Sequence, residues 1–66
     1  MALMHEEQAL AYLRETLRRT MNEYADNVAT GSCNDFSEYK RLCGVIEGLA
    51  LAERELLDLK EKLENR

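Results

Sequence analysis

Two stretches in which apolar residues recur every three or four positions constrain the fold of this chain most, because that spacing places them on one face of an α-helix. The first stretch runs from about residue 4 to residue 29, and its apolar face consists of Leu10, Leu13, Leu17, Met21, Tyr24 and Val28. In the second, from about residue 35 to residue 64, a leucine stands at every seventh position: Leu42, Leu49, Leu56 and Leu63. The sequence contains no proline to interrupt either stretch, so we predict two long helices.

The segment between the two stretches carries residues that end one helix and begin another. Gly31 suits the left-handed backbone conformation that closes a helix. Asp35 is the best N-cap of the second helix, because Glu38 follows three residues later in the position of a capping box. Ser32 and Ser37 are rival caps.

Because a short connection makes consecutive helices antiparallel neighbours, we predict an all-α fold. The chain of 66 residues is then a single domain, residues 1–66, an antiparallel two-helix hairpin with helices at about 4–29 and 35–64.

The leucine repeat of the second helix predicts a coiled-coil seam that packs on the first helix. The intervening seam positions begin with Tyr39 and Ile46 but continue with a charged residue, Glu53. A carboxylate buried alone is costly, so we expect Glu53 to lie at an edge in contact with solvent. The alternative is an ion pair with Arg14 or Arg18 of the first helix, within the hairpin or across an interface.

Further apolar residues remain on the second helix after the seam is assigned. They lie on both flanks and on the back of the helix: Val45, Ala52, Leu59, Cys43, Ala50, Leu57, Gly44, Gly48 and Leu51. Between residues 43 and 52, only Glu47 is polar. A helix that is apolar nearly all round is buried nearly all round. We therefore expect the first helix and at least one other chain to enclose it, which assembles hairpins into a helical bundle.

Gly44 and Gly48 lie in the interior of the predicted second helix, although glycine costs roughly 1 kcal/mol relative to alanine inside a helix. With Ala52 they form a ladder of small residues that lets another backbone approach closely. We interpret the ladder as a close contact with another helix. The alternative is that the glycines make room for a large side chain of the first helix, such as Tyr12 or Tyr24.

A chain this short usually relies on disulfides, a metal or a partner chain for its stability. Cys33 and Cys43 lie too far apart for a bond if Cys43 stands two turns into the second helix. Together with His5 they have no metal-ligand spacing, so we predict no metal and no cofactor. That leaves a partner, and we expect a homo-oligomer, either a dimer or a ring. The interface is predicted at Leu42, Gly44, Val45, Ile46, Gly48, Leu49, Ala52, Leu56, Leu59 and Leu63. The polar residues predicted to face a larger partner are Arg14, Arg18 and Arg19.

Charge and motifs argue against several classes of function. The net charge is −4 and no basic face dominates, which argues against nucleic acid as a partner. The longest nearly apolar run, residues 43–52, is too short to span a bilayer, and the first residues do not resemble a signal peptide. We find no glycine-rich phosphate loop, nucleophile elbow or HExxH motif, so we do not expect an enzyme.

The stretch DFSEYKRLCGVIEGLALAERELLDL, residues 35–59, begins with aromatic-x-x-Tyr-Lys and continues with Gly-Val-Ile-x-Gly-Leu and Ala-Glu-Arg-Glu-Leu. It resembles small uncharacterised helical proteins of tailed bacteriophages. The resemblance implies a component of a virion or of its morphogenesis, located in the virion or in the host cytoplasm. It implies no catalytic residues.

These features favour a non-enzymatic helical protein that self-associates through its second helix and serves as a structural or accessory part of a phage assembly. The rival hypothesis is a small phage-encoded inhibitor that binds a host enzyme or defence complex. A stable homo-oligomer favours the first hypothesis. A chain that stays monomeric, or that orders only with a host protein, favours the second.

Overall fold

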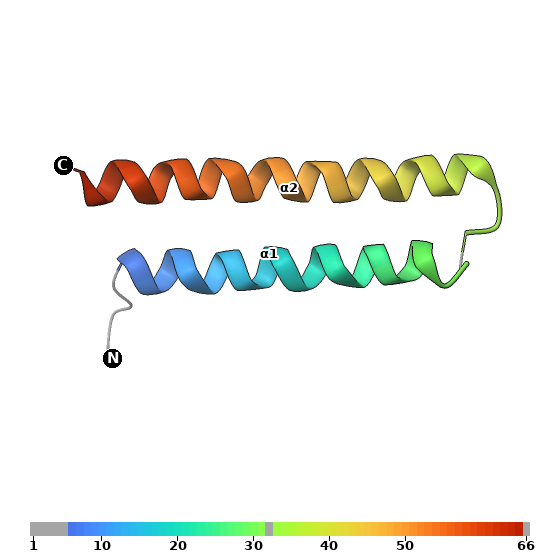
Figure 1. The fold of residues 1–66 in the computed structure, drawn as a ribbon, viewed down its shortest axis with the longest axis horizontal. Helices are drawn as coiled ribbons and strands as arrows, with labels where there is room; N and C mark the ends of the chain where they lie inside the picture. The colour runs from blue at the N-terminus through green and yellow to red at the C-terminus, as the bar shows by residue number, and fades with distance from the viewer. Residues whose placement is uncertain (1–5, 32, 66) are drawn as a thin grey trace.

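A computed structural model of the chain describes residues 6–31 and 33–65 as two helices that lie side by side (Figure 1). Helix α1 spans Glu6–Ala29 and helix α2 spans Phe36–Glu64, and the two run antiparallel. The hairpin measures 47 × 26 × 15 Å, and the last turn of α2 extends past the start of α1. The prediction of an all-α hairpin is confirmed. The first two residues of the predicted N-terminal helix, Met4 and His5, lie outside the described residues.

The connection begins as the sequence predicts. The backbone N–H of Thr30 donates to the carbonyl of Asp26 at 2.9 Å, and the N–H of Gly31 donates to the carbonyl of Val28 at 3.2 Å. Gly31 has a φ of 76°, the left-handed conformation that a side chain would strain. These contacts satisfy carbonyl groups that the end of α1 would otherwise leave without partners.

The N-cap of α2 is Asp35, which confirms the choice among the three candidate caps. Its backbone is extended, with φ −154° and ψ 175°, and its carboxylate accepts the backbone N–H of Glu38 at 2.8 Å. The Glu38 carboxylate in turn accepts the backbone N–H of Asn34 at 3.2 Å. The capping box therefore closes on the residue before the cap and orders the connection as well as the helix start.

The buried part of the hairpin is a narrow stripe. Among the described residues, Leu42 and Leu56 are the buried apolar side chains, with exposed fractions of 5% and 7%. Leu49 and Leu63 of the same repeat are half-buried, and α1 contributes no fully buried residue. The predicted face of α1 is half-buried at Leu10, Leu17, Met21, Tyr24 and Val28, whereas Leu13 is 47% exposed.

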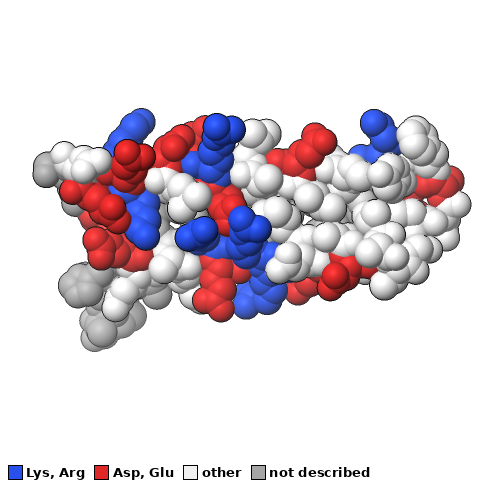
Figure 2. Space-filling model, in the orientation of Figure 1, with Lys and Arg blue, Asp and Glu red and all other residues white. Residues whose placement is uncertain are grey.

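Charged residues are unevenly distributed over the hairpin. On the face drawn in Figure 2, they gather over the half in which α1 begins and α2 ends, and other residues cover most of the half near the connection. The half near the connection contains the beginning of α2, and in α2 the sequence is nearly free of charge between residues 43 and 52. The end of α1 and the beginning of α2 both lie in this half, so both helices contribute to the mostly uncharged surface.

Replacing the cap tests this description of the connection. Asp35→Ala should lower the free energy of unfolding by about 1 kcal/mol, because the N–H of Glu38 loses its acceptor. Ser37→Ala is the matched control, since Ser37 lies inside α2 and should tolerate the change within about 0.5 kcal/mol. Chemical denaturation at equal protein concentrations measures both, and equal losses in the two variants would contradict the assignment of the cap.

Candidate interaction site

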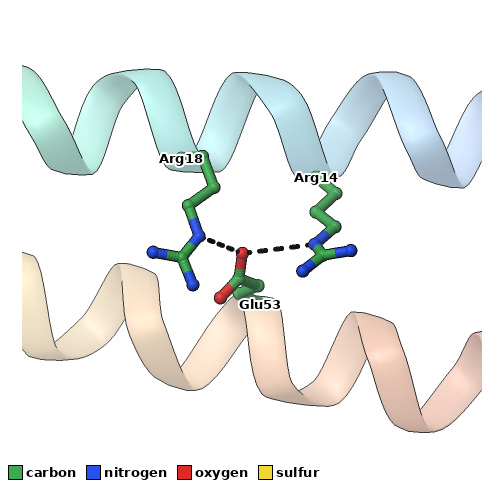
Figure 3. Close-up of polar contacts among 3 residues, drawn as sticks. All are labelled: Arg14, Arg18 and Glu53. Atoms are coloured by element: carbon green, nitrogen blue, oxygen red, sulfur yellow. Dashed lines mark hydrogen bonds and ion pairs between the residues drawn. The ribbon is translucent and has the colours of Figure 1, made fainter.

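A buried carboxylate joins the two helices. Glu53 of α2 is 7% exposed, and it lies between two arginines that stand one turn apart on α1 (Figure 3). The Nε of Arg18 donates to Oε2 of Glu53 at 2.7 Å, and the Nε of Arg14 donates to the same oxygen at 3.5 Å. The prediction that Glu53 lies at a solvated edge is wrong, and the ion pair that we considered as the alternative is present with both arginines.

The arrangement explains how a charge is tolerated inside the seam. Two arginines four residues apart lie on the same side of α1 and reach Glu53 from both directions along the helix. The side chain of Arg14 remains 48% exposed and that of Arg18 57% exposed. Each side chain therefore keeps contact with water while its Nε donates to the carboxylate. The three residues together, which we call the ion triad, carry a net charge of +1.

The ion triad also shifts the ionisation of Glu53. The hydrogen bond from Arg18 is the main reason that the pKa of the Glu53 carboxyl lies below its ordinary value of 4.5. Burial opposes this effect, and the charge of Arg18 and the contact with Arg14 reinforce it. Glu53 therefore stays ionised throughout the neutral range.

The three arginines predicted to face a larger partner have separate positions. Arg14 and Arg18 bind Glu53 through Nε, and about half of each arginine side chain stays exposed to solvent. Arg19 is exposed on α1. An external partner would therefore meet one independent arginine and the outer edge of the ion triad.

Large apolar side chains stay uncovered on the surface, mostly on α2. The exposed members, with their exposed fractions, are Tyr12 64%, Leu13 47%, Phe36 71%, Tyr39 41%, Leu51 63%, Leu57 37% and Leu59 47%. Five of these seven belong to α2. Isolated exposed apolar residues are ordinary on protein surfaces, but five large ones on a single helix leave much of the apolar surface of α2 in contact with solvent.

The predicted interface residues divide into two groups. Leu42 and Leu56 are buried against α1, and the half-buried members are Val45, Ile46, Leu49 and Leu63. The exposed members are Gly44, Gly48, Ala52 and Leu59. The first group holds the hairpin together, and the second remains available to another chain.

No packing contact among the described residues requires a glycine at position 44 or 48. A Cβ atom added at Gly44 or at Gly48 would meet no atom within 4 Å. The alternative that they make room for Tyr12 or Tyr24 is therefore wrong for the described chain. Their unfavourable helix propensity is not offset by any contact inside one protomer.

The first turn of α2 carries an aromatic pair that sequence reasoning missed. The rings of Phe36 and Tyr39 stack with centroids 5.9 Å apart, and Nζ of Lys40 lies 6.0 Å from the centre of the Phe36 ring. A hydrogen bond with the thiol of Cys43 is the main cause that raises the pKa of Tyr39 above its ordinary value. The spacings of three and four residues along one helix were the signal that could have indicated these contacts.

Within the described residues, no three His, Cys, Asp or Glu side chains come together in a way that could hold a metal ion. Cys33 and Cys43 are free, half-buried thiols. Neither helix, over its described length, is long and apolar enough to cross a membrane.

Comparison with known proteins found no match to this chain among protein-family models, curated proteins or solved structures.

The ion triad predicts how stability depends on pH. Glu53→Gln should lower the melting temperature at neutral pH, because two guanidinium groups lose their shared carboxylate. Since the pKa of Glu53 is lower in the folded hairpin than its ordinary value of 4.5, its contribution to stability is complete above about pH 4.5 and is lost as the pH falls through the folded pKa. The melting temperatures of wild type and variant should therefore converge in acid.

Three further variants complete that pH series. Arg18→Gln should reduce the melting temperature more than Arg14→Gln, because the Arg18 contact is 2.7 Å long and the Arg14 contact is 3.5 Å. Glu15→Gln on the exposed surface of α1 is the control and should follow wild type at every pH. A deficit of Glu53→Gln that stays the same size across the whole acid titration of the hairpin would contradict the role assigned to the ionised carboxylate.

Proposed function

We propose that this chain is a non-enzymatic helical interaction protein that self-associates through α2. The observation that supports it most is the contrast between two buried apolar side chains in the described hairpin and five large exposed ones on α2. Folding a chain of this size requires more apolar burial than so narrow a stripe supplies. A second chain that covers the outer surface of α2 supplies the missing burial.

The surface of α2 also has the composition of an assembly interface. Leu51 is 63% exposed, and Gly44, Gly48 and Ala52 beside it leave the backbone open to a close neighbour. Small residues allow two helix axes to approach toward the short end of the usual range of 8–10 Å. The number of dispersion contacts between two helices rises as they approach.

We further propose that the assembled hairpins serve as a structural or accessory component of a tailed bacteriophage, in its virion or during its morphogenesis. The resemblance of residues 35–59 to small phage proteins supports this role. The polar face of α1, with Arg19 and the outer edge of the ion triad, is then left for a larger phage or host protein.

The mass of the chain in solution tests self-association directly. Sedimentation equilibrium should give an oligomer at micromolar concentration. Gly48→Leu should convert it to a monomer or weaken it strongly, because the added side chain separates the two backbones. The same change fits within one protomer, since the space above Gly48 is open, and it removes a helix-propensity cost of about 0.8–1 kcal/mol.

Gly48→Ala is the matched variant, because it removes most of the propensity cost but adds only a methyl group. It should retain the oligomer or weaken it mildly. A wild-type chain that melts cooperatively as a monomer at the same concentration would overturn the proposal and would favour the inhibitor hypothesis.

A further inference from the structure

The outward strip of α2 around Gly48 has an internal order. Successive residues of an α-helix are about 100° apart, so Arg41, Gly44, Ala52 and Glu55 all lie within about 40° of the direction of Gly48. All five residues are exposed, and a Cβ atom at either glycine would meet open space. We call these five residues the glycine strip.

The glycine strip is symmetric in size about its centre and opposite in charge at its ends. Gly44 and Ala52 stand four residues before and after Gly48, and Arg41 and Glu55 stand seven residues before and after it. Neither Arg41 nor Glu55 has an ion-pair partner among the described residues. Such a strip matches a copy of itself only when the copy runs in the opposite direction.

We propose that a second copy of this chain docks on the glycine strip with the two α2 helices antiparallel and a twofold axis at Gly48. This inference rests on the proposed self-association and specifies its register. Each Gly48 then faces the partner's Gly48, and each Arg41 faces the partner's Glu55, with the reciprocal pair on the other side of the axis.

Charge decides between the two directions of packing. A parallel pair in register would place Arg41 beside the partner's Arg41 and Glu55 beside the partner's Glu55, which is repulsive at both ends. The antiparallel pair replaces these repulsions with two opposite-charge contacts. Each lies seven residues, or about 10 Å, from the crossing point, where crossing helices begin to separate and leave space for long side chains.

Packing favours the same register. With no side chains at the crossing point, the two backbones approach most closely at Gly48, and Gly44 meets a second small residue, the partner's Ala52. Leu51, which is 63% exposed, lies about 60° around α2 from Gly48, at the edge of the contact, where the partner's helix reduces its exposure. The direction of α1 lies about 110° around α2 from Gly48, so the first helix does not obstruct the contact.

Disulfide trapping tests the register. In a chain with Cys33→Ser and Cys43→Ser, Gly48→Cys should form a covalent dimer on mild oxidation, because the two α-carbons lie within the reach of about 7 Å. Gly44→Cys is the matched control and should not form one, since its own copy lies eight residues, or about 12 Å, away along the axis. An equal mixture of Gly44→Cys and Ala52→Cys chains should form the mixed dimer.

Charge reversal tests the same pairing without new cysteines. Arg41→Glu and Glu55→Arg should each weaken the dimer about tenfold, because each change replaces two attractive pairs with repulsive ones. The double variant, in which both pairs are reversed, should recover most of the lost affinity. Sedimentation equilibrium at low salt measures all three, and the effects should shrink as salt is added.

The results separate the register from self-association itself. A wild-type oligomer in which Gly44→Cys forms its own covalent dimer as readily as Gly48→Cys would overturn the antiparallel register and leave self-association standing. If the dissociation constant of the oligomer is the same in wild type, Arg41→Glu and Glu55→Arg, the register would also be overturned. A monomeric wild type would overturn both proposals.

Discussion

A hairpin of two helices covers only one stripe of each helix, and this geometric limit governs the whole molecule. The stripe of α2 that meets α1 contains Leu42 and Leu56, which are buried, and two further leucines of the same repeat that are half-buried. On the opposite surface Leu51 is 63% exposed, and Cβ atoms added at Gly44 and Gly48 would meet no described atom within 4 Å. Because apolar surface left in water gives no stabilisation, the helix that holds the hairpin together is also the one on which we propose that a second chain docks.

The leucine repeat alone does not say which side of α2 meets α1. The four leucines form a coiled-coil stripe either with Tyr39, Ile46, Glu53 and Lys60 or with Val45, Ala52 and Leu59. In the hairpin, α1 covers the first alternative, since Glu53 is buried and Leu59 is 47% exposed. The arginines of α1 make that choice possible by neutralising the carboxylate. The uncharged alternative is thereby left on the outside.

This division has a consequence for specificity. The inner contact contains a polar element that is satisfied only when Glu53 stands between Arg14 and Arg18, so it defines the relative position of the two helices. The outer contact proposed at the glycine strip contains no buried charge at its centre and gains from close approach of backbones. The two surfaces of α2 therefore differ in chemistry, and neither is a good substitute for the other.

Local features were predictable from the sequence, whereas features that join the two helices were not. The helix ends depend on residues within a few positions of each other, which is why Gly31 and Asp35 were assigned correctly. The burial of Glu53 depends on which residues of α1 stand opposite it, and that register follows from the packing of the whole hairpin. The exposure of Leu13 has the same origin. Its spacing from Leu10 and Leu17 places it on the apolar face of α1, but α2 leaves 47% of its surface exposed.

At the two glycines, the structure removes one of two explanations that the sequence leaves open. In the sequence, Gly44 and Gly48 were compatible with a close neighbour or with a bulky side chain from the first helix. The open space above both positions removes the second explanation. Two residues of low helix propensity with no packing contact among the described residues that requires them are the reason that we propose a second chain at this surface. In the proposed dimer, close approach of a second backbone offsets the cost of that low propensity and reduces the exposure of Leu51, which is 63% in the single hairpin.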